Sequence, residues 1–217
     1  MLYSKKETRT QIIKEDRTSE PGKVVKYLPG PKKKPFDEIP YLENERIVLK
    51  KLQQKDAESL YSLAHSEKIY RYLPTFLFEQ KYEDIHQVID LMYKECFEQK
   101  ESIILGIFLK EPDQEKDSMP FCGLAEMYGF KDSIHKISIG YRLLERYWGK
   151  GIATQAAALM ADYLYNETDV EIITASTMVE NQASANVLRK NGFVLTAAAV
   201  GEDWGYPEAT ITDKWIR

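Results

Sequence analysis

The stretch Arg146-Tyr147-Trp148-Gly149-Lys150-Gly151-Ile152-Ala153 joins an apolar segment, residues 136–144, to a segment with helical spacing. The apolar positions after the glycines are Ile152, Ala156, Leu159, Met160, Tyr163 and Leu164, which form one face of a helix. Two glycines at a strand-to-helix connection let backbone N–H groups face outward, where the helix dipole adds about half a positive charge. The stretch therefore predicts a phosphate or pyrophosphate site, to which Arg146 and Lys150 add positive charge. The alternative is a flexible turn that holds no ligand.

Other phosphate-binding motifs fit this stretch less well. No segment matches the Gly-x-x-x-x-Gly-Lys-[Ser/Thr] pattern of nucleoside-triphosphate sites. A dinucleotide fingerprint requires Gly or Ala where Thr154 stands, although Glu171 does lie 20 residues after Gly151. The glycines also come too late for a doubly wound sheet to follow them, so a nicotinamide site is disfavoured.

The rest of the chain alternates strand and helix patterns around this connection. The expected elements are, in order, a strand at 47–49, helices over 57–64 and 85–96, strands at 103–109, 121–127 and 136–144, a helix from 152, a strand at 171–178, a helix over 183–190, and strands from 193. The charged stretch 111–120 is expected to be a hairpin loop. This order predicts an α/β (α+β) domain with a single mixed sheet flanked by helices.

A second motif follows the glycines: Asn181-Gln182-Ala183-Ser184, ending at Asn191-Gly192-Phe193. Together with the Arg-x-x-Gly-x-Gly loop, this order and spacing resembles the GNAT superfamily of acetyl-CoA-dependent N-acetyltransferases. The most similar branch includes the ribosomal-protein N-terminal acetyltransferases. The resemblance extends over residues 41–217, and Glu45-Arg46-Ile47-Val48-Leu49, Asp56-Ala57 and Ile139-Gly140-Tyr141 also fit that branch.

The resemblance implies a mostly antiparallel central sheet in which two neighbouring strands splay apart and admit the pantetheine arm of acetyl-CoA. We expect these strands to be 121–127 and 136–144. Several residues would then bind the cofactor: Gly149, Gly151, Ile152 and Ala153 through their N–H groups, Leu143 through its backbone, and Asn181 from the following helix. No metal is implied, and the family's reaction is direct acetyl transfer to a primary amine.

Glu126 is the candidate general base, because it is a lone acidic residue in an apolar strand. The alternative is that Glu126 faces solvent on an alternating strand. Many family members carry a tyrosine shortly before the Gly-Phe pair, but residues 187–189 contain none. Ser184 is the remaining candidate proton donor for the leaving thiolate, or it is a first-turn serine that satisfies a helix-end N–H. A thiol has a pKa of about 8.5, so the thiolate can also leave without strict acid help.

The acceptor is not identified by sequence, and both a protein or peptide α-amine and a small amine are open. An aromatic stretch is equally compatible with an acceptor pocket and with core: Tyr70, Tyr72, Phe76 and Phe78. The histidines His65, His86 and His135 show no metal-binding spacing. A different function on the same fold is a non-catalytic acyl-CoA sensor or scaffold, which the missing tyrosine favours.

The charge of the 217-residue chain is unevenly distributed. Residues 1–40 carry 10 basic and 6 acidic residues, whereas 41–217 carry 20 basic and 28 acidic residues. We therefore expect a basic N-terminal extension, 1–40, followed by an acidic catalytic domain, 41–217, that favours cationic acceptors. Lys32-Lys33-Lys34 raises the idea of a nucleic-acid or ribosome anchor, but a solvated tail is favoured over it. Val24–Leu28 is a candidate short strand.

Composition excludes several other classes. A hydrophobic content of 43% is sufficient for a core and argues against wholesale disorder. No apolar run approaches the length of a membrane span, and the N-terminus is polar, so neither membrane insertion nor secretion is expected. Cys96 and Cys122 are too few for a disulfide framework and are expected to be buried thiols. These features predict a cytoplasmic monomer or homodimer.

Overall fold

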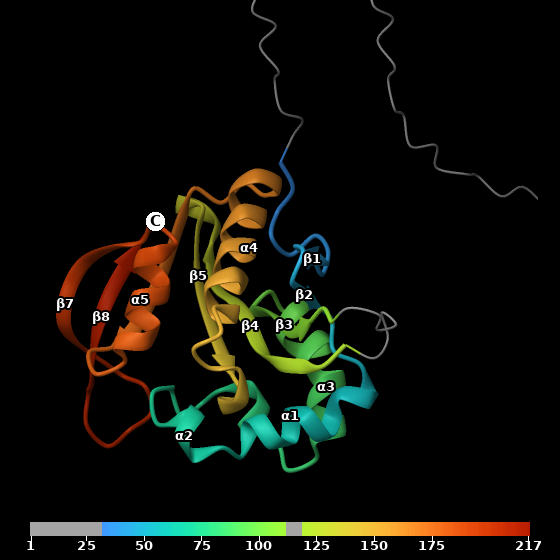
Figure 1. Cartoon of the computed structure of the whole chain (residues 1–217). Helices are drawn as coiled ribbons and strands as arrows, with labels where there is room; N and C mark the ends of the chain where they lie inside the picture. The colour runs from blue at the N-terminus through green and yellow to red at the C-terminus, as the bar shows by residue number, and fades with distance from the viewer. Residues whose placement is uncertain (1–31, 112–118) are drawn as a thin grey trace, which may run out of the picture. The chain divides into compact units, whose positions relative to one another are not determined.

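A computed structural model describes residues 32–111 and 119–217. They form an eight-stranded sheet in the order β1-β2-β3-β4-β5-β6-β8-β7 (Figure 1). The strands are β1 Leu42–Glu43, β2 Ile47–Lys50, β3 Ser102–Leu109, β4 Phe121–Lys131, β5 Lys136–Leu143, β6 Ile172–Met178, β7 Val194–Glu202 and β8 Thr210–Ile216. Only β5 and β6 pair in parallel, and the other neighbours are antiparallel. The predicted mixed, mostly antiparallel sheet is confirmed.

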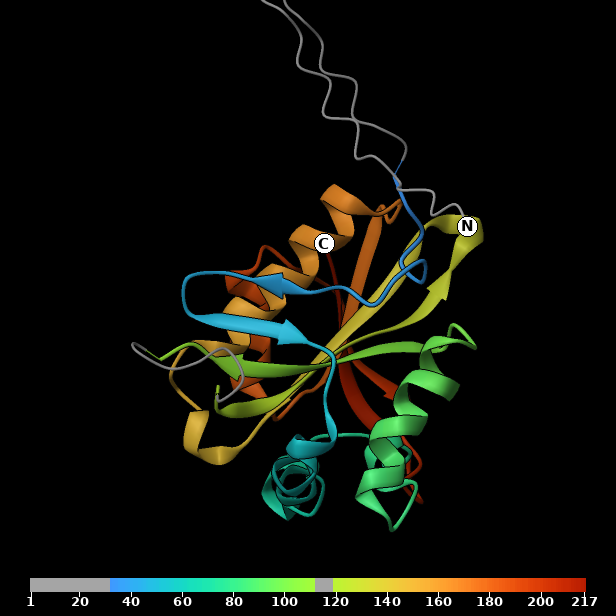
Figure 2. The same ribbon diagram turned by 90° about the vertical axis from the view of Figure 1, so that its right-hand side faces the viewer.

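Helices cover both faces of the sheet. The helices are α1 Ala57–Ala64, α2 Glu67–Tyr70, α3 Ile85–Leu91, α4 Ile152–Glu167 and α5 Gln182–Lys190. Figure 2 shows α4 on one side of the sheet and α1 and α3 on the other. Helix α4 forms because its predicted apolar face is buried completely at Ala156, Met160 and Leu164, and because alanine favours the helix.

Two predicted elements differ in extent from those in the structure. The expected helix over 85–96 is α3 followed by a π-helical turn at Met92–Phe97. The expected strand 121–127 continues to Lys131, because the residues after Met127 pair with the start of β5. The sequence patterns missed β1 and α2, which have two and four residues and are too short to show a period.

The expectation that strands 121–127 and 136–144 splay apart is wrong. β4 and β5 stay paired from Gly123↔Leu143 to Lys131↔Lys136, because a short turn at Asp132–Ile134 joins them as a hairpin. β5 and β6 instead pair only between 136–138 and 172–174. The long crossover through α4 joins these two parallel strands, so no tight turn holds them together. The splay therefore lies between β5 and β6.

The described body begins at Lys32, inside the segment that the sequence assigns to the extension. Phe36 is buried, and its ring lies 5.9 Å from that of Phe97 and 6.2 Å from that of Phe130. Lys33 forms a β-bridge with Thr168. Residues 32–40 therefore pack on the domain, whereas the candidate strand Val24–Leu28 lies outside the described residues.

The core contains both cysteines as free thiols, as expected. Burial is the largest influence on each, and it raises the pKa of Cys96 and of Cys122 to about 11. Within 32–111 and 119–217, no helix combines the length and the apolar composition that crossing a bilayer requires.

Candidate active site

A cavity of about 950 Å³ opens at the splay between β5 and β6. Its walls come from β4, β5, β6, the first turns of α4 and α5, the segment 68–81, and residues 202–204. Most of the residues singled out from sequence line this cavity: Glu126, Leu143, Gly149, Gly151, Ile152, Ala153, Asn181 and Ser184. The fold thus brings the predicted catalytic and cofactor residues to one cavity.

The glycine loop forms one end of the cavity. Gly149 and Gly151 adopt φ values of 70° and 76°, a backbone region that favours glycine, and Gly151 caps α4. The first intrahelical bond of α4 is donated by Gln155 to the Gly151 carbonyl, so the N–H groups of Ile152 and Ala153 have no partner within the helix. A Cβ on Gly149 would meet nothing within 4 Å, so this end is open to a ligand. These features fit a pyrophosphate.

Arg146 and Lys150 do not line the cavity. Both side chains are exposed and lie over the Tyr147 ring, at 5.0 Å and 5.6 Å from its centroid. Their part in cofactor binding stays a prediction. From these positions the two side chains would attract the cofactor phosphates through their positive charge, without lining the cavity. Leu143 lines the cavity, and its carbonyl accepts a hydrogen bond from Trp148 Nε1 at 2.8 Å.

Asn181 and Ser184 meet at the start of α5. The Asn181 side chain caps the helix by accepting a hydrogen bond from the Ser184 N–H at 3.1 Å. The Ser184 hydroxyl lies 3.0 Å from the Tyr141 hydroxyl, which also donates to the Ser184 carbonyl at 3.2 Å. Burial raises the pKa of Tyr141, and the hydrogen bond from Ser184 opposes that rise. A tyrosine is therefore present beside Ser184, supplied by β5.

Glu126 belongs to a buried network of charged side chains. Arg142 Nη1 donates to Glu126 Oε2 at 2.9 Å, and Arg142 Nη2 donates to Glu79 Oε2 at 2.6 Å. Tyr70 donates its hydroxyl proton to Glu79 Oε1. Burial alone would lower the pKa of Arg142, but the charges of Glu79 and Glu126 outweigh it and raise that pKa. Glu126 is thus held inside the cavity and does not face open solvent.

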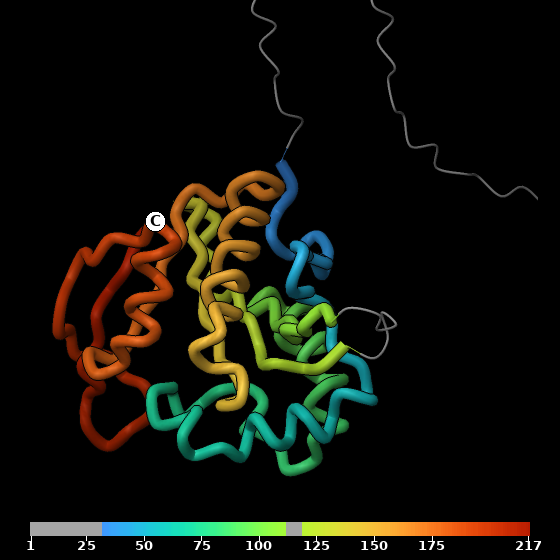
Figure 3. Tube along the Cα trace, in the orientation of Figure 1, coloured from blue at the N-terminus to red at the C-terminus, as the bar shows by residue number. Residues whose placement is uncertain are grey.

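The other end of the cavity is closed by segments that are far apart in sequence. The Thr75 N–H donates to the Trp204 carbonyl at 2.9 Å, and Tyr206 donates to the Leu73 carbonyl at 2.9 Å. Figure 3 shows the two segments side by side, one between α2 and α3 and the other between β7 and β8. Of the aromatic residues whose role was open, Tyr72, Phe76 and Phe78 line the cavity, whereas Tyr70 is buried in the charged network.

Comparison with known proteins places this geometry in a family. The sequence profile of the acetyltransferase (GNAT) domain matches residues 46–194, which is more than half of the chain. The chain belongs to the GNAT acetyltransferase family. GNAT enzymes use acetyl-CoA as their co-substrate, and the glycine loop at the start of α4 fits its pyrophosphate.

Individual proteins are similar to this chain. YoaA of Bacillus subtilis, described as an uncharacterized N-acetyltransferase, is 23% identical over 71% of this chain and 83% of its own length. The spermidine N(1)-acetyltransferase of Escherichia coli K12 is 27% identical over 68% of this chain and 72% of its own length.

Solved structures share the fold. A GNAT acetyltransferase from Bacillus anthracis matches with a TM-score of 0.67 at 20% identity, over 82% of this chain and 97% of its own. The ribosomal L7/L12 alpha-N-protein acetyltransferase RimL, solved with coenzyme A, matches with a TM-score of 0.66 at 17% identity, over 82% and 96%. The predicted likeness to the ribosomal-protein branch of GNAT enzymes is consistent with these neighbours.

Sequence reasoning missed three residues of this GNAT site. Arg142 and Glu79 were not singled out, and Tyr141 was noted only as part of the family pattern. One signal was available for Arg142, because it is a charged residue inside the otherwise uncharged stretch 139–144. Glu79 carried no such signal, since it stands in a loop-like aromatic stretch that packs against β5 only in the folded chain.

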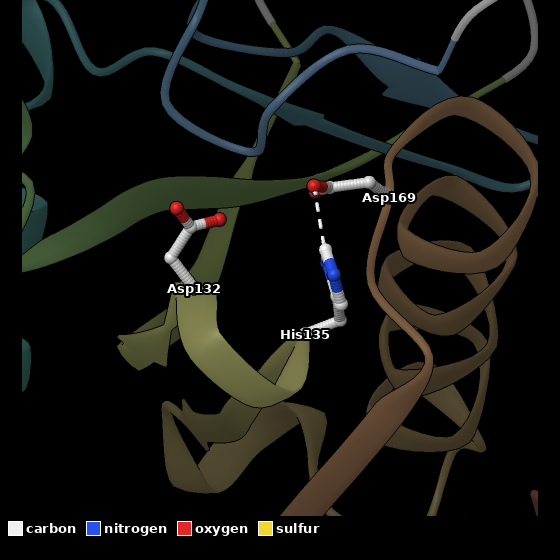
Figure 4. A group of neighbouring side chains, drawn as sticks. All are labelled: Asp132, His135 and Asp169. Carbon is white, nitrogen blue, oxygen red and sulfur yellow. Dashed lines mark hydrogen bonds and ion pairs between the residues drawn. The ribbon is translucent and has the colours of Figure 1, made fainter.

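A second cluster of ionisable side chains lies outside the GNAT cavity lining. The potential ligand atoms of Asp132, His135 and Asp169 lie within 4.8 Å of one another (Figure 4). His135 was predicted to show no metal-binding spacing along the sequence; in the structure Asp132 lies in the same turn, and Asp169 comes from the connection between α4 and β6. The Lys34 ammonium forms ion pairs with both aspartates. The positive charge of Lys34 therefore compensates negative charge of the two aspartates.

Proposed function

We propose that this enzyme transfers the acetyl group of acetyl-CoA directly to a primary amine that carries positive charge in solution. One observation carries the proposal: the glycine loop at the start of α4 and the carboxylate of Glu126 line the same cavity, which opens where β5 and β6 separate. A phosphate-binding end and a base are thus available to one bound pair of substrates.

The amine has to lose a proton before it can attack the thioester. At pH 7 this costs about 1 kcal/mol for an α-amine of pKa 7.7–8.0 and about 4–5 kcal/mol for a lysine-like amine of pKa about 10.4. Glu126 is the group in position to accept that proton, directly or through a water molecule. The amine nitrogen then bonds to the acetyl carbon, the carbon–sulfur bond breaks, and the thiolate leaves.

Ser184 and Tyr141 are in position to donate a proton to the leaving thiolate. Their hydroxyl groups are 3.0 Å apart, and both residues line the cavity. Backbone N–H groups of β5 beyond Ser138, where pairing with β6 ends, are candidates to polarise the thioester carbonyl.

The charges around the cavity support a cationic acceptor. Four carboxylates line it: Glu101, Glu126, Glu202 and Asp203. Four basic residues line it too: Lys68, Lys81, Arg142 and Lys190. Lys68 pairs with Glu145, Lys81 with Glu95, Arg142 with Glu126, and Glu202 with Lys214. Glu101 and Asp203 form no ion pair within the described residues, so an ammonium group would enter beside them with favourable electrostatics. The spermidine acetyltransferase among the relatives supports the same class of acceptor.

The test is an assay of free CoA release with acetyl-CoA and a panel of amines: peptides with free α-amines, polyamines and aminoglycosides. We expect turnover with at least one class. An absence of turnover with every amine would contradict the proposed transfer.

A non-catalytic acyl-CoA sensor is the second candidate, since residues 187–189 contain no tyrosine. It predicts acetyl-CoA binding in calorimetry with no transfer, and no effect of Glu126→Gln on any function. The contact between Tyr141 and Ser184 argues for the enzyme, because Tyr141 on β5 places a phenol beside Ser184 even though α5 carries no tyrosine at 187–189.

A further inference from the structure

The geometry points to Arg142 as a positioning residue that fixes Glu126 for proton removal from the acceptor. This inference rests on the proposed function, and it concerns a residue that neither touches the reacting atoms nor belongs to the sequence motifs. Arg142 acts through the carboxylate that it holds.

The arginine is almost fully enclosed and uses its planar fork on two carboxylates. Its side chain is 3% exposed, that of Glu79 is 0% exposed and that of Glu126 is 13% exposed. Nη1 is 2.9 Å from Glu126 Oε2, and Nη2 is 2.6 Å from Glu79 Oε2. Two directional bonds from one rigid guanidinium fix its plane, which lysine could not reproduce with a single ammonium.

The sheet register explains why Arg142 reaches Glu126. In the β4–β5 ladder, Glu126 lies opposite Gly140, and Arg142 lies opposite Leu124. Glu126 and Arg142 are therefore diagonal neighbours on the same face of the sheet. Gly140 has no side chain to separate them, and its own position lines the cavity.

The network contains one more negative charge than positive charge. Arg142 faces two carboxylates, and Glu79 is satisfied by Arg142 together with the Tyr70 hydroxyl. Within the described residues, Glu126 Oε1 has no hydrogen-bond partner, and of the two carboxylates in this network Glu126 is the one that lines the cavity. The uncompensated charge is thus directed at the cavity, where an acceptor ammonium would complete the network.

The test compares wild type with Arg142→Lys, which keeps a positive charge, and with the double variant Arg142→Met/Glu79→Gln, which removes the arginine without leaving Glu79 as a buried charge. The control is Arg217→Gln, an exposed arginine that lies over Tyr165. We expect kcat to fall about tenfold in Arg142→Lys and about 100-fold in the double variant. The acetyl-CoA dissociation constant should change less than about threefold.

A loss of kcat with an unchanged acetyl-CoA dissociation constant separates positioning of the base from a general loss of structure, because a damaged fold would weaken cofactor binding as well. Unchanged kcat in folded variants, with wild type active, would overturn the role of Arg142 alone. If Arg142→Lys does not fold, the double variant decides by kcat and the acetyl-CoA dissociation constant. A wild type that acetylates no amine would instead overturn the proposed function, and this inference with it.

Discussion

The two ends of the cavity are built in different ways. The end proposed to bind the cofactor comes from two short stretches, 143–154 and 181–188, in which neighbours in sequence are neighbours in space. The end proposed to bind the acceptor is assembled from the segment 68–81, residues 101–102 and 126–129, and residues 202–204. A strand, a glycine turn and a helix N-terminus make a phosphate site by local geometry alone. A pocket for an amine requires contacts that only the complete sheet provides.

The two ends of the cavity have different tasks in this account: one binds acetyl-CoA, and the other binds and deprotonates the amine. The backbone of the glycine loop holds acetyl-CoA in this account, so its contribution depends on main-chain conformation. Side chains from distant elements hold and deprotonate the amine, so their contribution depends on charge and on the network that positions them. Substitutions at the two ends should therefore change different kinetic constants.

The largest effect is expected for Glu126→Gln, at the acceptor end. Removal of the base should lower kcat by about 10²- to 10⁴-fold, while the dissociation constant of acetyl-CoA in calorimetry stays the same. Glu171→Gln, at an exposed carboxylate just before β6, is the matched control. A wild-type kcat in Glu126→Gln would remove Glu126 from the mechanism.

Gly151→Val, at the cofactor end, should weaken acetyl-CoA binding about 10- to 100-fold. A Cβ at φ 76° introduces strain of about 1–2 kcal/mol, and the branched side chain stands at the helix N-terminus that would hold the pyrophosphate. Gly201→Ala is the control, since an added Cβ there meets only Ala209 Cβ at an ordinary 3.5 Å. Unchanged affinity in Gly151→Val would place the cofactor elsewhere.

Ser184→Ala and Tyr141→Phe should each lower kcat by about tenfold or less, because a thiolate is a fair leaving group without an acid. The two hydroxyls share one hydrogen bond, so the double variant should lose about as much kcat as the more impaired of the two single variants. Stopped-flow measurement of CoA release tests this. Fully additive losses would show that the two hydroxyls act independently.

The smallest effect on catalysis, and a large one on stability, is expected at Phe36, far from either end in sequence. Phe36→Ala should lower the free energy of unfolding by about 2–4 kcal/mol, because a buried ring against Phe97 and Phe130 is lost. Tyr41→Ala, at a side chain that is 53% exposed, is the control in urea denaturation. Equal stability of the two variants would place the start of the domain after residue 40, as the sequence alone suggested.

The same contrast explains what could be predicted from the sequence. Local patterns predicted α1, α4, α5 and most strands, and they placed the glycine loop and Asn181 at the starts of two helices, where both cap the helix. Their roles in cofactor binding stay predictions. The splay was assigned to the wrong strand pair, because sequence does not show that β4–β5 is a tight hairpin while β5–β6 is joined through α4. Arg142 and Glu79 are 63 residues apart, and no local pattern links them.

The central claim is that both ends of this cavity serve one transfer of an acetyl group to an amine. The most direct test uses acetyl-CoA labelled in the acetyl carbon and mass spectrometry of the amine panel, with wild type and Glu126→Gln side by side. We predict that the label appears on the nitrogen of at least one cationic amine, with an equal amount of free CoA, and that Glu126→Gln slows its appearance by about 10²- to 10⁴-fold. Binding of acetyl-CoA without label on any amine, in both proteins alike, would contradict the account.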